Sequence, residues 1–164
     1  MLSEAQQKRV WEAMLAAEIR ANYFAELSTG YVQKQKIAVF TTLFFSSSAV
    51  VSLLFVKSDY WLVPWLRAGL GVVSAALAAY TFSTQNQKLA TETADLHARW
   101  NKLARDYEGL WEDVSQENAP MILKYLDERA ADASKPAVAI PYIEDRMLHW
   151  EKHVLAHRGL PLPA

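Results

Sequence analysis

The sequence predicts an all-α membrane protein built on a two-span transmembrane hairpin, with further helices on either side of it. Three observations predict this class. Residues 37–82 carry only three of the 35 charged side chains of the 164-residue chain, namely Lys57, Asp59 and Arg67. Each half of this block is long enough to cross a hydrocarbon core of about 30 Å as a helix. The charged flanks show helical periodicity, so the near-neutral mean hydropathy of −0.04 averages two different populations.

The first expected element is a cytosolic amphipathic helix over residues 1–30. Ser3 and Gln6 have the spacing of a capping box, and Gly30 is suited to a C-terminal cap. The pattern is compatible with packing on other cytosolic helices and with adsorption to the membrane surface. No apolar core of a secretory signal is present in this segment. Apolar residues recur at helical spacing through it: Val10, Trp11, Met14, Leu15, Phe24 and Leu27.

The next segment, 31–82, is expected to form the hairpin. Residues 37–56 contain no charge, and residues 60–82 contain one, Arg67, close enough to the end of the span to reach the headgroups. Three residues, 57–59, separate the runs, which predicts a tight antiparallel pair. Two basic residues lie near this loop and six near the other ends of the spans, so both termini are expected in the cytosol. The six are Arg20, Lys34, Lys36, Lys88, Arg99 and Lys102.

The first span carries a stripe of hydroxyl groups. Thr41, Ser48 and Ser52 fall within about 40° on a helical projection. With Phe45, or alternatively Phe44 or Phe55, as a hydrophobic constriction, this stripe is the candidate lining of a narrow pore. The alternative is that the hydroxyls donate to backbone carbonyls or bind neighbouring helices.

The second span carries a face of small residues, Gly71, Ala75 and Ala79, spaced by four. Small residues let helix backbones approach closely, so this face predicts tight helix packing. One hairpin cannot enclose a pore, and conduction would require a homo-oligomer. On the order of four copies is our working expectation, with three to six open. Neither span contains Asp, Glu or His, which argues against proton-coupled transport.

Residues 83–117 are expected to form a coiled-coil-like cytosolic stalk that continues directly from the second span. Apolar residues alternate at three- and four-residue steps, with Thr93 at the one polar position, until Pro120 interrupts the pattern. This seam predicts a helix–helix contact. A second subunit and the chain's own N-terminal helix are both open as its partner. The seam consists of Leu89, Leu96, Trp100, Leu103, Tyr107, Leu110 and Val114.

The last segment, 118–164, is expected to form a C-terminal helical module. It contains a short helix over 120–133, a connector over 135–141 and a helix over 142–157 that Gly159 ends. His149, His153 and His157 share one face of the last helix, but a solvated or interface stripe is favoured over a metal site. The sequence has no cysteine, phosphate-binding loop or catalytic triad. We therefore expect no enzyme activity and no cofactor.

Residues 83–164 hold ten Lys or Arg and thirteen Asp or Glu, so no long nucleic acid is expected as a partner. A small nucleotide could still bind a local basic cluster.

The stretch Ile19-Arg20-Ala21-Asn22-Tyr23-Phe24, followed by a spacer, a two-span hairpin and a long charged helix, resembles the SLATT family. These are bacterial two-span membrane proteins associated with nucleotidyltransferase and nucleotide-sensor genes. The resemblance covers roughly residues 10–115.

It implies an effector of antiviral defence in the bacterial cytoplasmic membrane that oligomerises and opens a pore. A nucleotide signal from a partner nucleotidyltransferase would gate the pore, and opening would depolarise the host membrane. No ligand-binding residues follow from the resemblance.

Two other functions are compatible with the sequence. In the first, the hairpin only anchors a non-conducting scaffold that recruits a cytosolic partner. In the second, a metal-dependent or nucleotide-processing enzyme would rest on the three histidines alone.

Overall fold

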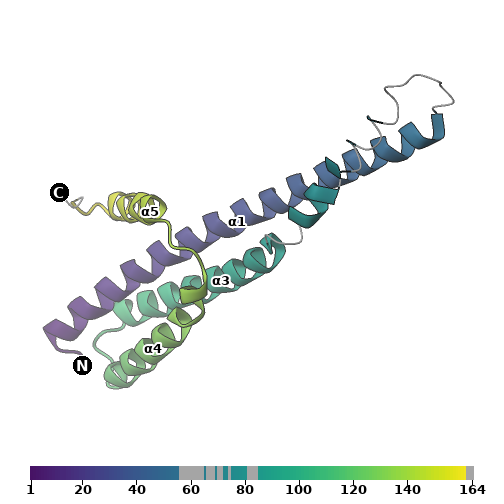
Figure 1. Cartoon of the computed structure of the whole chain (residues 1–164). Helices are drawn as coiled ribbons and strands as arrows, with labels where there is room; N and C mark the ends of the chain where they lie inside the picture. The colour runs from purple at the N-terminus through teal and green to yellow at the C-terminus, as the bar shows by residue number, and fades with distance from the viewer. Residues whose placement is uncertain (56–64, 66–68, 70–71, 74, 81–84, 162–164) are drawn as a thin grey trace. The chain divides into compact units, whose positions relative to one another are not determined.

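The computed structural model describes residues 1–55, 65, 69, 72–73, 75–80 and 85–161, with only the backbone for residues 45–46 and 48–55. This part of the chain is helical and contains no strand, so the predicted all-α class is confirmed (Figure 1). It divides into two compact units. We call Met1–Ser28 with Thr91–Ala164 the packed unit, and Thr29–Ala90 the apolar unit.

None of the helices in the described residues combines the length and the apolar character that a membrane span requires. The two expected spans are described only in part. The side chains of residues 45–46 and 48–56 lie outside the described set, as do most residues of the second run.

The first helix, α1, extends from Glu4 to Phe55. It begins with the predicted capping box: the Ser3 N–H donates to Gln6 Oε1 at 2.9 Å, and the Gln6 N–H donates to Ser3 Oγ at 3.3 Å. It does not end at Gly30, where we expected a cap. A glycine inside a helix costs only about 1 kcal/mol, which longer-range packing readily offsets. The expected N-terminal helix and the start of the first expected span are therefore one continuous helix.

The next described helix, α3, extends from Asn86 to Glu112 and is shorter than the expected stalk. Gln85, immediately before it, has a φ of 45°. A residue inside an α-helix needs a φ near −63°, so no helix passes through Gln85. The expectation that the stalk runs unbroken from the second span is wrong for this reason.

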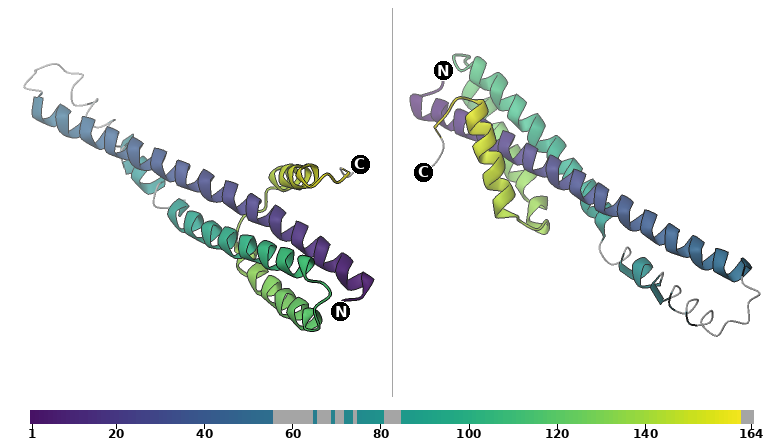
Figure 2. Two further views of the ribbon diagram at one scale, coloured as in Figure 1. Left: turned by 180° about the vertical axis from the view of Figure 1, so that it is seen from behind. Right: turned by 90° about the horizontal axis from the view of Figure 1, so that it is seen from above.

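Within the packed unit, α1 and α3 are antiparallel. The Trp11 and Trp111 ring centroids are 5.2 Å apart, and the Arg20 guanidinium lies 4.8 Å from the Trp100 ring. Residue numbers in α3 fall as those in α1 rise, which fixes the direction of pairing. The helix α4, Ala119–Ser134, lies along α3, as the views of Figure 2 show. Its Asp127 accepts a hydrogen bond from the Tyr107 hydroxyl at 3.0 Å.

The central part of the predicted seam forms the core of the packed unit. Five seam residues and Thr93 are each at most 4% exposed within a single chain. Leu89 is half-buried, and Val114 lies beyond the end of α3, where its carbonyl accepts from the Leu2 N–H at 3.3 Å. Helices α1 and α4 supply the facing apolar side chains, so the chain itself accommodates the seam. The buried members are Leu96, Trp100, Leu103, Tyr107 and Leu110.

The C-terminal segment follows the expected order. Pro120 lies in the first turn of α4, a short 3-10 helix η1 spans Pro136–Ala139, and α5 spans Glu144–His157. Gly159, with a φ of 68°, ends α5 in a Schellman motif. Its amide donates to the Ala156 carbonyl at 3.1 Å, and the Leu160 amide donates to the Leu155 carbonyl at 2.9 Å.

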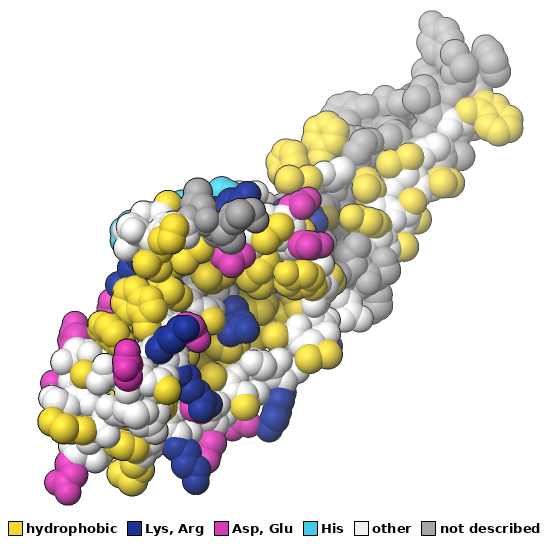
Figure 3. Space-filling view, turned by 90° about the vertical axis from the view of Figure 1, so that its left-hand side faces the viewer, with side chains coloured by type: hydrophobic (Ala, Val, Ile, Leu, Met, Phe, Trp, Pro, Cys, Tyr) yellow, Lys and Arg dark blue, Asp and Glu magenta, His cyan; other side chains and the backbone are white. Residues whose placement is uncertain are grey.

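The apolar unit exposes large hydrophobic side chains. Ile37, Phe40 and Phe44 lie on one face of α1 and are 67%, 71% and 59% exposed. Trp65 and Val72 are 73% and 69% exposed. In Figure 3, Lys, Arg, Asp and Glu side chains lie among apolar and polar ones on the packed unit, whereas apolar side chains predominate among the described residues of the apolar unit. A contiguous apolar surface of this kind marks a contact with lipid or protein.

Candidate functional site

The packed unit contains a half-open cavity of about 500 Å3. This volume is within the range of small-molecule sites, about 300–1,000 Å3. Helices α1, α3 and α5, the end of α4 and the η1 segment all contribute to its walls. The lining side chains are Ala16, Ile19, Arg20, Tyr23, Phe24, Trp100, Ser134, Ala137, Ile140, Tyr142, Met147 and Glu151.

The α1 wall comes from the stretch Ile19–Phe24, on which the family resemblance was based. Ile19, Arg20 and Tyr23 face the cavity because residues three and four apart share one side of a helix. Ala21 faces α3 instead. Its carbonyl lies 2.9 Å from His97 Nδ1, and since a carbonyl can only accept, Nδ1 is the donor. One short motif thus builds both a cavity wall and the α1–α3 contact.

Tyr23 joins this wall to the segment before α5. The side chain is buried, and its hydroxyl donates to the Pro141 carbonyl at 3.3 Å and accepts from the Ile143 N–H at 3.0 Å. Its ring lies 6.4 Å from the ring of Tyr142. The hydroxyl is therefore used to hold the wall, and the ring provides an aromatic surface.

Arg20 and Trp100 form the most polar part of the cavity. The guanidinium lies over the indole ring in cation–π geometry. Arg20 has no carboxylate partner among the described residues, and partial burial lowers its pKa. The indole Nε1 of Trp100 is buried and, within the described part of the chain, has no hydrogen-bond acceptor. Trp100 Nε1 is thus a buried donor without an acceptor among the described residues, whereas Arg20 is exposed to solvent.

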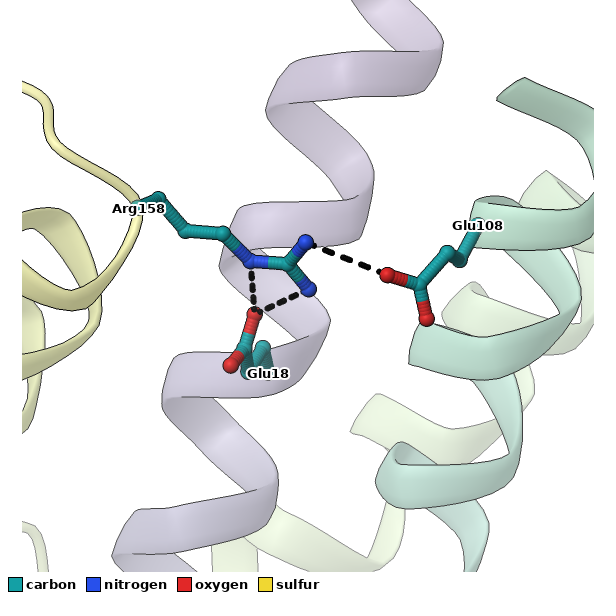
Figure 4. A network of polar contacts seen from close by, with 3 residues as sticks. All are labelled: Glu18, Glu108 and Arg158. Atoms are coloured by element: carbon teal, nitrogen blue, oxygen red, sulfur yellow. Dashed lines mark hydrogen bonds and ion pairs between the residues drawn. The ribbon is translucent and has the colours of Figure 1, made fainter. Parts of the chain in front are cut away.

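Helix α5 forms another wall through Met147 and Glu151, and polar contacts hold it in place. Near its start, Arg146 lies 3.4 Å from the Glu26 carboxylate, and at its middle Trp150 Nε1 donates to the same carboxylate at 2.7 Å. After its end, Arg158 reaches two helices (Figure 4).

The Arg158 guanidinium donates to Glu18 on α1 at 3.0 and 3.2 Å and to Glu108 on α3 at 3.1 Å. Burial of the guanidinium lowers its pKa, but the hydrogen bonds to the two carboxylates outweigh this and raise the pKa of Arg158 overall. We call Arg158 with Glu18 and Glu108 the α5 clasp. Sequence spacing did not indicate it, because its members are 50 and 140 positions apart.

A second groove, of about 640 Å3, lies between α3 and α4. It brings together Lys102, Arg105 and Arg129, the kind of basic cluster a small nucleotide would need. Asp106 and Asp113 line the same groove, and Asp106 pairs with Arg129 at 2.9 Å. The mixed charge makes it a weaker candidate than the cavity.

The predicted pore and packing residues are only partly described. Thr41 Oγ1 donates to the Ile37 carbonyl at 2.7 Å, which is the backbone alternative considered above. The side chains of Phe45, Ser48 and Ser52 lie outside the described residues, and so does Gly71. Ala75 and Ala79 are exposed. The pore-lining and helix-packing assignments therefore stay predictions.

The histidine stripe does not converge on one point. The His149 and His153 ring centroids are 6.4 Å apart, and the His153 ring lies 5.2 Å from that of Trp150. The described residues contain no group of three or more His, Cys, Asp or Glu side chains positioned to hold a metal ion.

In comparisons with known proteins, no family model, no curated protein and no solved structure matches the chain.

Proposed function

We propose that this chain is a ligand-controlled membrane effector of bacterial antiviral defence. Its apolar unit inserts as a two-span hairpin in the cytoplasmic membrane, with both termini in the cytosol. Copies associate into a pore that depolarises the membrane, and a nucleotide signal from a partner nucleotidyltransferase gates it. The proposal is carried by the combination of two observations in one chain. The apolar unit exposes large hydrophobic side chains, and the packed unit contains a cavity of ligand size.

Membrane insertion is supported by the backbone and side chains of the first apolar run. Residues 37–56 are uncharged, and α1 continues through Ile37–Phe55 without interruption. A continuous helix satisfies its own backbone hydrogen bonds, as the bilayer core requires. Moving the exposed side chains of Ile37, Phe40 and Phe44 out of water is favourable by about 25 cal/mol per Å2 of apolar surface.

Association is supported by the small residues of the second run. Ala75 and Ala79 are exposed, so a second helix can approach their backbone closely. The central seam residues are buried inside the chain, so the apolar unit is the proposed contact between copies. In that assembly, Thr41, Phe45, Ser48 and Ser52 would face the pore axis.

A non-conducting membrane scaffold is the second candidate. The hydrogen bond from Thr41 to the Ile37 carbonyl favours it, because a hydroxyl that donates to its own backbone has no proton left to donate to water in a pore.

The test is expression of the full chain in bacteria with a voltage-sensitive dye. We expect the chain in the carbonate-resistant membrane fraction and rapid depolarisation on induction. Ser48→Trp should abolish depolarisation because the indole would block the stripe. Ser47→Trp is the matched control: it adds the same bulk about 100° around the helix from Ser48 and should leave depolarisation intact.

Each other result rejects a defined part of the proposal. Recovery of the chain in the soluble fraction would reject the membrane hairpin. A chain that inserts in the membrane but causes no depolarisation, either alone or with the nucleotidyltransferase co-expressed, would favour the scaffold. Equal depolarisation by both tryptophan variants would reject the hydroxyl stripe as the pore lining.

A further inference from the structure

We propose that the cavity of the packed unit binds a small planar aromatic anion that also carries an N–H or hydroxyl donor. Binding itself does not depend on membrane insertion. The idea that the bound molecule controls the effector rests on the proposed function.

The need for an anion follows from Arg20. Five of the six other arginines of the packed unit lie within 4.0 Å of a carboxylate: Arg9, Arg99, Arg129, Arg146 and Arg158. The sixth, Arg105, is exposed and lines the mixed-charge groove between α3 and α4. Arg20 lines the cavity and contacts the Trp100 ring instead. The Arg20 side chain is exposed to solvent, so its guanidinium is accessible to an anion that enters the cavity. A carboxylate or phosphate in the cavity would supply the missing partner in bidentate geometry.

The need for a planar group follows from the walls. Four aromatic side chains line the cavity: Tyr23, Phe24 and Trp100 are at most 5% exposed, and Tyr142 is the accessible one. Ile19 and Met147 add apolar walls. The Tyr142 side chain is 66% exposed, so its ring is accessible to a ligand that enters the cavity. Stacking of a flat ring on an aromatic side chain is favourable and tolerates different ring types.

The need for a donor, and for only one anionic group, follows from Glu151. Its carboxylate lines the same cavity, and no ion pair joins it to Arg20. The charges of Arg20 and Glu151 cancel, which disfavours ligands with several phosphates. A carboxylate only accepts hydrogen bonds, so it selects a ligand that offers an N–H or O–H. Purine mononucleotides and indole carboxylic acids both have this chemistry.

The buried Nε1 of Trp100 adds a second reason for a bound partner. A buried donor without an acceptor destabilises the folded state, because its lost hydration is not replaced. Arg20 lies over the ring that carries this donor. Movement of Arg20 toward a bound anion would let a ligand oxygen or an accompanying water approach Nε1 and recover that cost.

The test is isothermal titration calorimetry on the full chain. The protein is placed in lipid nanodiscs if it fractionates with membranes and in buffer if it does not. The probes are guanosine monophosphate, adenosine monophosphate, indole-3-acetate and inorganic phosphate. We expect at least one planar probe to bind with a Kd below about 1 mM, and inorganic phosphate to bind at least tenfold more weakly.

The variants test the assigned contacts. Arg20→Gln should weaken binding by about 10- to 100-fold through loss of a charged hydrogen bond. Glu151→Gln should weaken binding of a probe with N–H donors and leave inorganic phosphate unchanged. Arg99→Gln, which removes an exposed arginine elsewhere on α3, is the matched control and should bind as the parent does. Circular dichroism checks that every variant keeps its helix content. Arg20→Lys keeps the positive charge, so this variant should retain part of the affinity.

The source of the ligand is read from the same titrations. Binding of the mononucleotides alone assigns a nucleotide, and binding of indole-3-acetate alone assigns an aromatic acid. Equal binding of inorganic phosphate would overturn the planar requirement. Absence of binding by all four probes, or unchanged binding in a folded Arg20→Gln variant, would overturn the proposal. Membrane depolarisation is measured separately, so failure here is distinguishable from failure of the proposed function.

Discussion

Tyr107 belongs to a polar network that joins three helices through Asp127. The side chain is 1% exposed in α3, and its hydroxyl donates to Asp127 on α4. Asp127 is also paired with Arg9 on α1 at 2.7 Å. Burial, followed by the hydrogen bond and the negative charge of Asp127, raises the pKa of Tyr107 well above its ordinary value. The folded state therefore favours the protonated phenol.

Tyr107→Phe should lower the free energy of unfolding by about 1–2 kcal/mol at pH 8, where the hydrogen bond is intact. The tyrosine pKa is raised in the folded state, so its contribution is fully present below the unfolded value of about 10. It is lost as the pH rises from there toward the folded pKa. The difference between parent and Tyr107→Phe should therefore narrow above pH 10. Urea unfolding between pH 8 and 11, followed by circular dichroism, measures it.

Tyr125→Phe is the control for this experiment, because Tyr125 is exposed on α4. Its difference from the parent should stay near zero across the series. A Tyr107→Phe difference that stays constant to pH 11 would contradict the proposed burial of the neutral phenol.

Among the elements, α5 depends most on polar contacts made at its ends. Val154 is its one buried residue. Glu26 holds the helix near its start and at its middle, and the α5 clasp holds the segment after its end. Met147 and Glu151 line the cavity between these two attachments, so loosening of α5 would open the cavity.

Arg158→Gln should increase amide exchange throughout residues 144–157. The guanidinium is 28% exposed and its partners are 24% and 42% exposed, so solvent screens the pairs and the local loss is about 1–2 kcal/mol. Hydrogen–deuterium exchange with mass spectrometry should show faster exchange in α5 by about 5- to 30-fold, with α3 and α4 unchanged. Arg99→Gln, which breaks an exposed i, i+4 pair, should change nothing in α5. Unchanged exchange in α5 would show that the clasp does not hold it.

At the scale of the whole molecule, α1 belongs to both units. The segment Met1–Ser28, which includes the cap and the first part of α1, belongs to one unit with Thr91–Ala164. The chain between these two segments forms the apolar unit. The packed unit therefore forms only when two segments separated by about 60 residues meet. Its core is the seam of α3 against α1 and α4.

Leu103→Asp tests whether this seam is a core or a subunit contact. Leu103 is 1% exposed, and burial of a charge there should unfold the packed unit at every protein concentration. Met121→Asp, at a position that is 71% exposed on α4, should leave the unit folded. Limited proteolysis of residues 91–164 measures the fold, and chemical crosslinking measures assembly. Loss of crosslinking in a protease-resistant Leu103→Asp chain would make the seam an oligomer contact instead.

Features that depend on near neighbours in the chain were predictable. The Ser3–Gln6 capping box, the first turn of α4 at Pro120 and the end of α5 at Gly159 need only a few consecutive residues, so their signals are local. The heptad spacing predicted that Leu96 and Leu103 would be buried. It could not choose between a second subunit and the chain's own α1, because both partners bury the same area.

The tertiary structure alone decided what depends on distant segments. Helix α1 continues past Gly30, since one glycine is a weak local stop, and α3 begins after Gln85, where the backbone is not helical. The spacing of Ile19, Arg20 and Tyr23 places them on one helix face, but only the approach of α3 and α5 makes that face a cavity wall. By itself, the sequence determined the helical class, most caps and the apolar faces. The partner of each face follows from packing free energies summed over the whole chain, which no local pattern contains.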